Sequence, residues 1–237
     1  MVQVSTKKTL LFIPGLICDA ELWRNQINAF KDEYNILVAD HSQSDDFETL
    51  AQLIINDVPD RFHLIGLSMG GYLAQEIIRR VPERVEKLAL MATSSRLDPD
   101  TIRKTRIGLV QLASKGRFVG MSRQMLGTFV HESKLDDPSV ADVVYAMAKK
   151  TGSESFIKQQ KAILSRPHLQ PFLKDISVKT LIICGDSDPR TPVEYHQEIA
   201  DGIPHADWHI LENCGHLPPL EQPEKVNHLM KQWLTND

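Results

Sequence analysis

Short apolar runs alternate with amphipathic segments along most of the chain. Runs of buried-strand length occupy residues 9–13, 35–39, 62–65, 85–91, 180–184 and 208–211. Apolar residues recur at helical spacing between them, over residues 22–30, 47–58, 72–80 and 223–234. Strands that alternate with helices predict an α/β fold with a mostly parallel, doubly wound sheet. In such a sheet the ligand site lies at the carboxyl ends of the strands.

The interval from residue 97 to 172 departs from this alternation. It has no strand pattern and shows helical spacing over residues 102–113, 118–130, 140–149 and 156–164. It is too long for a loop. We therefore predict a single domain over residues 1–237, with its core in 1–96 and 173–237 and a helical cap inserted as 97–172. An extra helical layer without a role in selectivity is the alternative.

Composition narrows the class of protein. A net charge of −4 in 237 residues argues against nucleic-acid binding as the main activity. No apolar run approaches the length of a membrane span, and the first residues reach Pro14-Gly15 too soon for a signal peptide. Cys18, Cys184 and Cys214 lack metal or disulfide spacing, which indicates reduced thiols. We expect a cytoplasmic protein.

The stretch FHLIGLSMGG, residues 62–71, carries the strongest chemical signal. An apolar strand runs into Gly66-Leu67-Ser68-Met69-Gly70, and a helical pattern follows at once. G-x-S-x-G between a strand and a helix is typical of a nucleophile elbow, in which a strained turn exposes the serine. The glycines leave room for the tight turn. Ser68 is the predicted nucleophile; a glycine-rich turn with an idle serine is the alternative.

A serine nucleophile needs a base, and the base needs an acid that orients it. Asp186 and Asp188 follow the strand at 180–184, and His216 follows the strand at 208–211. Serine, then aspartate, then histidine is the chain order found on this kind of sheet. His205 and His209 are spaced too far apart along a strand to share an ion, so no metal and no cofactor are predicted.

Five motifs make the chain resemble the α/β-hydrolase superfamily, in its compact, cap-bearing carboxylesterase-like form. They are LLFIPG with Trp23 following, GLSMGG, LALMATSS, LIICGDSDPRTP and NCGHLPPLEQPEKV. The resemblance implies that Asp188 is the acid and His216 the base. Two segments depart from the family pattern: Pro14-Gly15 replaces the usual His-Gly, and residues 41–44 (HSQS) replace a usual Arg-Gly-x-Gly turn. The second region should therefore pack differently.

An oxyanion hole on this fold takes one backbone N–H after the nucleophile and one from the loop after the first strand. These donors are predicted to be Met69 and Leu16. Because backbone donors constrain side chains little, we expect Leu16 and Met69, with Ile17, Trp23 and Leu217, to line an apolar acyl pocket. The predicted function is that of a serine hydrolase cleaving a small carboxylic ester or thioester. A non-catalytic ligand-binding protein and a cofactor-free lyase or oxygenase are the alternatives.

Charge is unevenly distributed along the chain. Residues 101–131 contain six basic side chains and no Asp or Glu, and residues 97–172 carry 12 basic and 7 acidic residues. A basic cap on an acidic body would attract anionic substrates. Acyl groups on coenzyme A or on an acidic acyl carrier are such substrates. The alternative is that these side chains form solvated helix faces.

Overall fold

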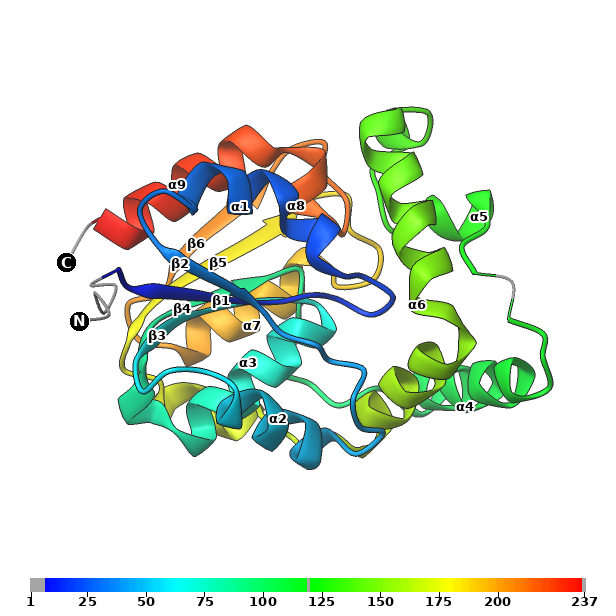
Figure 1. The fold of residues 1–237 in the computed structure, drawn as a ribbon, viewed down its shortest axis with the longest axis horizontal. Coiled ribbons are helices and arrows are strands. Elements are labelled where there is room, and N and C mark those ends of the chain that lie inside the picture. Colours follow the sequence, from blue (N-terminus) through cyan, green and yellow to red (C-terminus); the bar gives the residue numbers. More distant parts are fainter. Residues whose placement is uncertain (1–6, 119, 236–237) are drawn as a thin grey trace, which may run out of the picture.

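The computed structural model describes residues 7–118 and 120–235, which contain one parallel sheet of six strands (Figure 1). The spatial order is β2-β1-β3-β4-β5-β6. The strands are β1 (Thr9–Ile13), β2 (Asn35–Val38), β3 (Phe62–Leu67), β4 (Val85–Met91), β5 (Lys179–Gly185) and β6 (Asp207–Leu211). Every residue of β1 and β3 is buried, as expected for strands covered on both faces. The predicted α/β class is confirmed.

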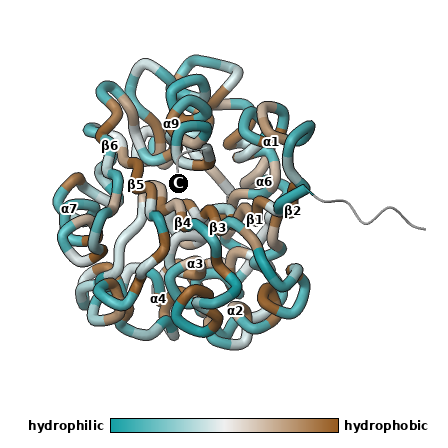
Figure 2. The backbone as a smooth tube through the Cα atoms, turned by 90° about the vertical axis from the view of Figure 1, so that its left-hand side faces the viewer, coloured by the Kyte–Doolittle hydropathy of each residue, from teal (hydrophilic) through white to brown (hydrophobic). Residues whose placement is uncertain are grey.

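Helices cover both faces of the sheet. One face carries α1 (Arg24–Phe30), α8 (Pro218–Glu221) and α9 (Pro223–Thr235) (Figure 1). The other carries α2 (Phe47–Asn56), α3 (Met69–Arg80) and α7 (Val193–Gly202). Figure 2 shows the apolar strands β1, β3 and β4 between these two layers. The core therefore lies on both sides of the central strands.

A helical segment connects β4 to β5 and stands beyond one end of the sheet (Figure 1). It consists of α4 (Asp100–Ser114), α5 (Arg123–Leu126) and α6 (Pro138–Ser165), and is called the α4–α6 segment below. The predicted break between two helices is present inside α6, where Gly152 has a φ of 67°. The predicted helix over 118–130 is wrong in length. Among the residues of this range that the structure describes, α5 is the α-helix, and Gly120 has a φ of 66°, which a helix does not accommodate.

The chain changes direction around β1. After β1 it crosses to β2 on one side and then returns to β3 on the other side of β1. Ile13 pairs in register with Gly66, so the loops that follow β1 and β3 leave the sheet side by side. Such a switch in strand order opens a crevice at the carboxyl edge, where ligands bind.

The described helices include none that is long and apolar enough to cross a membrane. Cys18, Cys184 and Cys214 are all buried free thiols. Burial raises the pKa of the Cys184 thiol to about 11 and that of Cys18 to about 12, so both are neutral near pH 7. Neither is an activated nucleophile.

A buried histidine in β3 makes stability depend on pH. His63 packs against the rings of Tyr34 and Trp233, and burial lowers the pKa of His63 to about 4. The pKa of His63 is lower in the folded chain than in the unfolded chain. The contribution of neutral His63 to the free energy of unfolding is therefore fully present above pH 6.5. It is lost at about 1.4 kcal/mol per pH unit as the pH falls toward 4.

His63→Phe keeps an aromatic ring and removes the titration. Between pH 7 and pH 4.5, urea unfolding should show a loss of stability about 2 kcal/mol smaller for His63→Phe than for wild type. Equal losses would contradict this role.

Candidate active site

Ser68 lies in a strained turn between the end of β3 and the start of α3. Its φ of 55° and ψ of −114° fall in a region that L-residues rarely adopt. A Cβ on Gly66 would lie 2.3 Å from the Gly70 carbonyl oxygen, and a Cβ on Gly70 would lie 2.0 Å from that of Ile13. The absence of side chains at these two positions therefore permits the turn. The predicted strand–turn–helix geometry is present.

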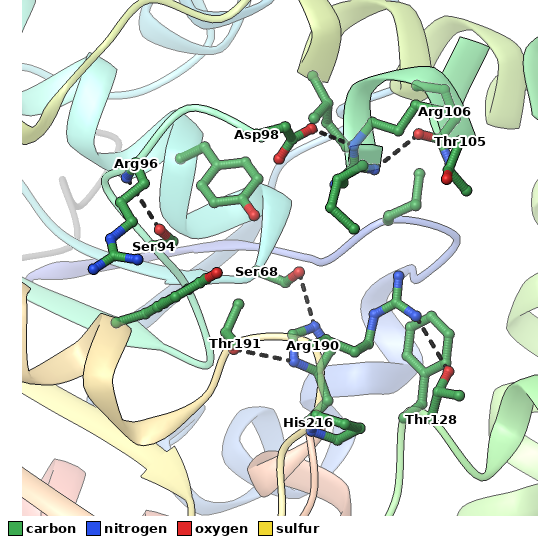
Figure 3. Close-up of a pocket in the computed structure, with 18 of the residues that line it drawn as sticks. Ser68, Ser94, Arg96, Asp98, Thr105, Arg106, Thr128, Arg190, Thr191 and His216 are labelled. Atoms are coloured by element: carbon green, nitrogen blue, oxygen red, sulfur yellow. Dashed lines mark hydrogen bonds and ion pairs between the residues drawn. The ribbon is translucent and has the colours of Figure 1, made fainter. Parts of the chain in front are cut away.

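The structure brings Ser68, His216 and Asp188 into one hydrogen-bonded chain. His216 Nε2 lies 2.9 Å from Ser68 Oγ (Figure 3), and His216 Nδ1 lies 2.7 Å from Asp188 Oδ2. Asp188 follows β5 and His216 follows β6, so three strand ends supply the three groups. Asp186 points elsewhere: its Oδ1 accepts bonds from the Ser187 hydroxyl and, at 3.4 Å, from the backbone N–H of Cys214.

The Asp188 carboxylate is buried and ionised. Its oxygens accept bonds from the Thr191 hydroxyl at 2.6 Å and from the backbone N–H groups of Arg190 and Thr191 at 2.8 and 3.2 Å. Burial alone would raise the pKa of Asp188. The facing His216 and these hydrogen bonds outweigh burial and hold the pKa at about 2. A permanent negative charge thus lies beside His216 Nδ1 at neutral pH.

A second buried carboxylate, Glu221, supports the loop that carries His216. It accepts the backbone N–H groups of Gly215 and Leu217, both at 2.9 Å, on either side of the histidine. It also accepts the backbone N–H of His131 at 2.8 Å, from the α4–α6 segment. The sequence analysis assigned no role to Glu221. The signal available was a lone carboxylate in the apolar, proline-rich run LPPLEQP.

The α4–α6 segment also contacts the His216 loop directly. The backbone N–H of His216 donates to the carbonyl of Phe129 at 2.7 Å, and the two rings meet edge to face at 5.8 Å. A Cβ on Gly215 would lie 2.6 Å from the His131 nitrogen. The loop and the segment are therefore packed backbone against backbone.

Residues from other parts of the chain also hold the loop after β1 in place. The Cys18 N–H bonds to the Gly15 carbonyl at 3.0 Å, which closes a turn in which Ile17 has a φ of 58°. The Ile17 N–H donates to Gln159 Oε1 of α6 at 3.0 Å, and His41 Nε2 donates to the Gly15 carbonyl at 2.9 Å. His41 belongs to the HSQS segment (residues 41–44), which therefore helps to hold the loop after β1. That this segment packs differently from the family stays a prediction.

The predicted oxyanion donors come from two different segments of the chain. Met69 is the first residue of α3, and Leu16 lies in the turn beside the elbow. In the described part of the chain neither backbone N–H has an acceptor. Both N–H groups are therefore free to donate, and their role in an oxyanion hole stays a prediction.

A cavity of about 500 Å³ opens above Ser68 and His216 (Figure 3). Leu16 and Ile17 line it, as expected. Trp23 and Leu217 do not: Trp23 packs on Phe12 of β1 at 5.0 Å, and Leu217 is fully buried in the core. The fully buried Met69 side chain also lies outside the lining. Most of the remaining lining comes from residues 94–109, 125–129, 156–166 and 189–195.

Comparison with known proteins identifies the class. The model of the alpha/beta hydrolase fold family matches residues 58–223, and the chain belongs to this family. The structure of a thermophilic esterase from Thermogutta terrifontis superposes with a TM-score of 0.87 at 24% identity, covering 97% of this chain and 90% of that chain. The enol-lactonase from Burkholderia xenovorans gives a TM-score of 0.85 at 20% identity, covering 99% and 94%. At these identities the superpositions establish the fold.

The curated relatives act on different bonds. "Putative carbamate hydrolase RutD" from Serratia proteamaculans is 24% identical, over 95% of this chain and 90% of the relative. A 2-hydroxy-6-oxononadienedioate/2-hydroxy-6-oxononatrienedioate hydrolase from Paraburkholderia phymatum is 26% identical, over 96% and 87%. The relatives are hydrolases, and they do not agree on one substrate.

Replacement of Glu221 tests its support of the loop that carries His216. In Glu221→Gln an amide NH₂ replaces one acceptor oxygen and faces backbone N–H donors. We expect a loss of about 1–3 kcal/mol in the free energy of unfolding and a fall in kcat larger than any rise in KM. Urea unfolding and steady-state kinetics measure both. The exposed Glu212→Gln in the same loop is the matched control. Wild-type values for Glu221→Gln would refute the role.

Proposed function

We propose that this protein is a serine hydrolase that cleaves a small carboxylic ester through an acyl-enzyme on Ser68. The observation that carries the proposal is the Ser68–His216–Asp188 chain of hydrogen bonds, at 2.9 and 2.7 Å, opening on a 500 Å³ cavity. A serine hydroxyl bonded to an imidazole that is itself bonded to a buried carboxylate is the arrangement that activates a serine.

In this mechanism His216 Nε2 accepts the Ser68 proton while Oγ attacks the substrate carbonyl carbon. The ionised Asp188 holds Nδ1–H toward itself and stabilises the imidazolium that forms. The N–H groups of Leu16 and Met69 bind the oxyanion. His216 then protonates the leaving alcohol, and a water molecule activated by His216 hydrolyses the acyl-enzyme.

We propose that residues 97–172 act as a cap that shapes the substrate site. Support comes from the cavity lining, since side chains of α4 and α6 face Ser68 across the cavity. It also comes from Phe129, His131 and Gln159, whose bonds hold the base loop and the loop after β1. Ile17, which lines the cavity and directly follows Leu16 in the chain, is a proposed acyl-pocket residue.

Labelling and turnover test the nucleophile. A fluorophosphonate probe should label wild type and leave Ser68→Ala unlabelled, and Ser68→Ala should lose at least 1,000-fold in kcat on nitrophenyl esters. The panel includes acyl-CoA thioesters, a carbamate and a 2-hydroxy-6-oxo-dienoate, because the relatives act on different bonds. Failure to label Ser68 would overturn the proposal. Preference for the dienoate would replace ester cleavage by carbon–carbon cleavage.

Two neighbouring carboxylates give a matched test of the acid. Asp188→Asn favours the wrong histidine tautomer and should lower kcat by about 1,000- to 10,000-fold. Asp186→Asn removes a carboxylate two residues away that bonds to the Ser187 hydroxyl and weakly to the Cys214 backbone, with no bond to His216, and should stay within about threefold of wild type. Steady-state kinetics on one ester decide the matter. If Asp186→Asn is the inactive variant, the assignment reverses.

A further inference from the structure

Four arginines line the cavity above Ser68, and they differ in how their charge is balanced. Arg106 and Arg166 share Asp98, at 2.5 and 2.7 Å, and Arg96 pairs with Glu198. Arg190 differs: no carboxylate of the described residues lies within ion-pair distance of its guanidinium. The cavity therefore holds more positive than negative charge.

The Arg190 side chain is nevertheless held in place. Its Cζ lies 4.1 Å from the centre of the Phe129 ring, and Nη1 donates to Thr128 Oγ1 at 3.2 Å (Figure 3). Its backbone N–H bonds to Asp188 Oδ1 at 2.8 Å, which fixes the start of the side chain to the triad acid. A guanidinium has five N–H donors. Within the described structure the bond to Thr128 uses one of them.

The surroundings of Arg190 favour an anion. The Arg190 side chain is exposed and lines the cavity, with the like charge of Arg106 nearby and the Asp188 carboxylate on the side of its backbone. A guanidinium is charged at neutral pH. Because Arg190 makes no ion pair among the described residues, its remaining N–H donors can bind an anionic group that enters the cavity.

We propose that Arg190 binds a carboxylate carried by the substrate, so that the preferred esters of the Ser68 centre are anionic ones. That the substrate is an ester rests on the proposed function. Arg190 and Ser68 line the same cavity, with Arg190 beside His216 in Figure 3. The planar fork of an arginine matches a carboxylate with two parallel hydrogen bonds. One end of the substrate is thus held while its ester carbonyl meets Ser68.

Matched substrates test the charge at either end of the ester. Mono-4-nitrophenyl adipate and 4-nitrophenyl hexanoate have acyl chains of equal length, which end in a carboxylate in the first and in a methyl group in the second. The esters of hexanoic acid with 4-hydroxybenzoate and 4-hydroxybenzamide differ by a charge on the leaving group. The quantity measured is the ratio of kcat/KM for the anionic ester to that for its neutral partner.

Arg190→Gln should lower this ratio by about 10- to 100-fold in at least one pair. Arg103→Gln removes the same charge from an exposed position on α4 outside the cavity, and should leave both ratios unchanged. The ratio separates a lost carboxylate contact from general damage near His216. If Arg190→Gln leaves both ratios unchanged, or if Arg103→Gln lowers them equally, the proposal is overturned.

A binding measurement separates this inference from the proposed function. Monoethyl adipate is titrated calorimetrically into Ser68→Ala and into Ser68→Ala/Arg190→Gln, neither of which needs to turn it over. At least tenfold weaker binding by the double variant supports the carboxylate site even if wild type cleaves no ester. Equal binding overturns the site even if ester hydrolysis by Ser68 is established.

Discussion

The arrangement of the site depends on how closely three backbones meet at the carboxyl edge of the sheet. The carbonyl of Ile13 occupies the space that a side chain on Gly70 would need, so the start of α3 lies directly against the end of β1. This contact puts the loop after β1 beside Ser68. The pairing of Ile13 with Gly66 fixes the position of this loop along the strand direction. A side chain at residue 70 would push Ser68 away from the loop after β1, since the Ile13 carbonyl occupies its space.

The second requirement is support from the α4–α6 segment, which is far away in sequence. Gln159 holds Ile17 in a conformation that a non-glycine residue rarely adopts. Phe129 bonds to the His216 loop, and His131 bonds to Glu221, which supports that loop. The segment thus contributes to the position of His216 and of the loop after β1, as well as to the walls of the cavity.

The sequence predicted what depends on local pattern. The strand order along the chain, the strained turn at Ser68 and the presence of His216 and two aspartates at strand ends follow from short motifs. The choice of Asp188 over Asp186 came from the family resemblance, and the structure places Asp188 against His216. The sequence did not predict in which direction the side chains of irregular segments point. Trp23 was expected in the pocket but packs on β1, because its short 3₁₀ turn (Ala20–Trp23) directs the indole into the core. The support from Gln159 depends on a contact across 142 residues, which no local spacing reveals.

The contact between residues 129–131 and the His216 loop has a consequence for how such a protein diversifies. A replacement of the α4–α6 segment by that of a relative exchanges the walls of the cavity and, in the same step, the residues that contact the His216 loop. The segment is therefore not an independent module. A chimera that keeps the recipient's residues 129–131 and Gln159 keeps the contacts to the His216 loop and to the loop after β1 while it acquires a new cavity. Variation of selectivity in this architecture is easiest in the parts of α4 and α6 that face the cavity and touch neither loop.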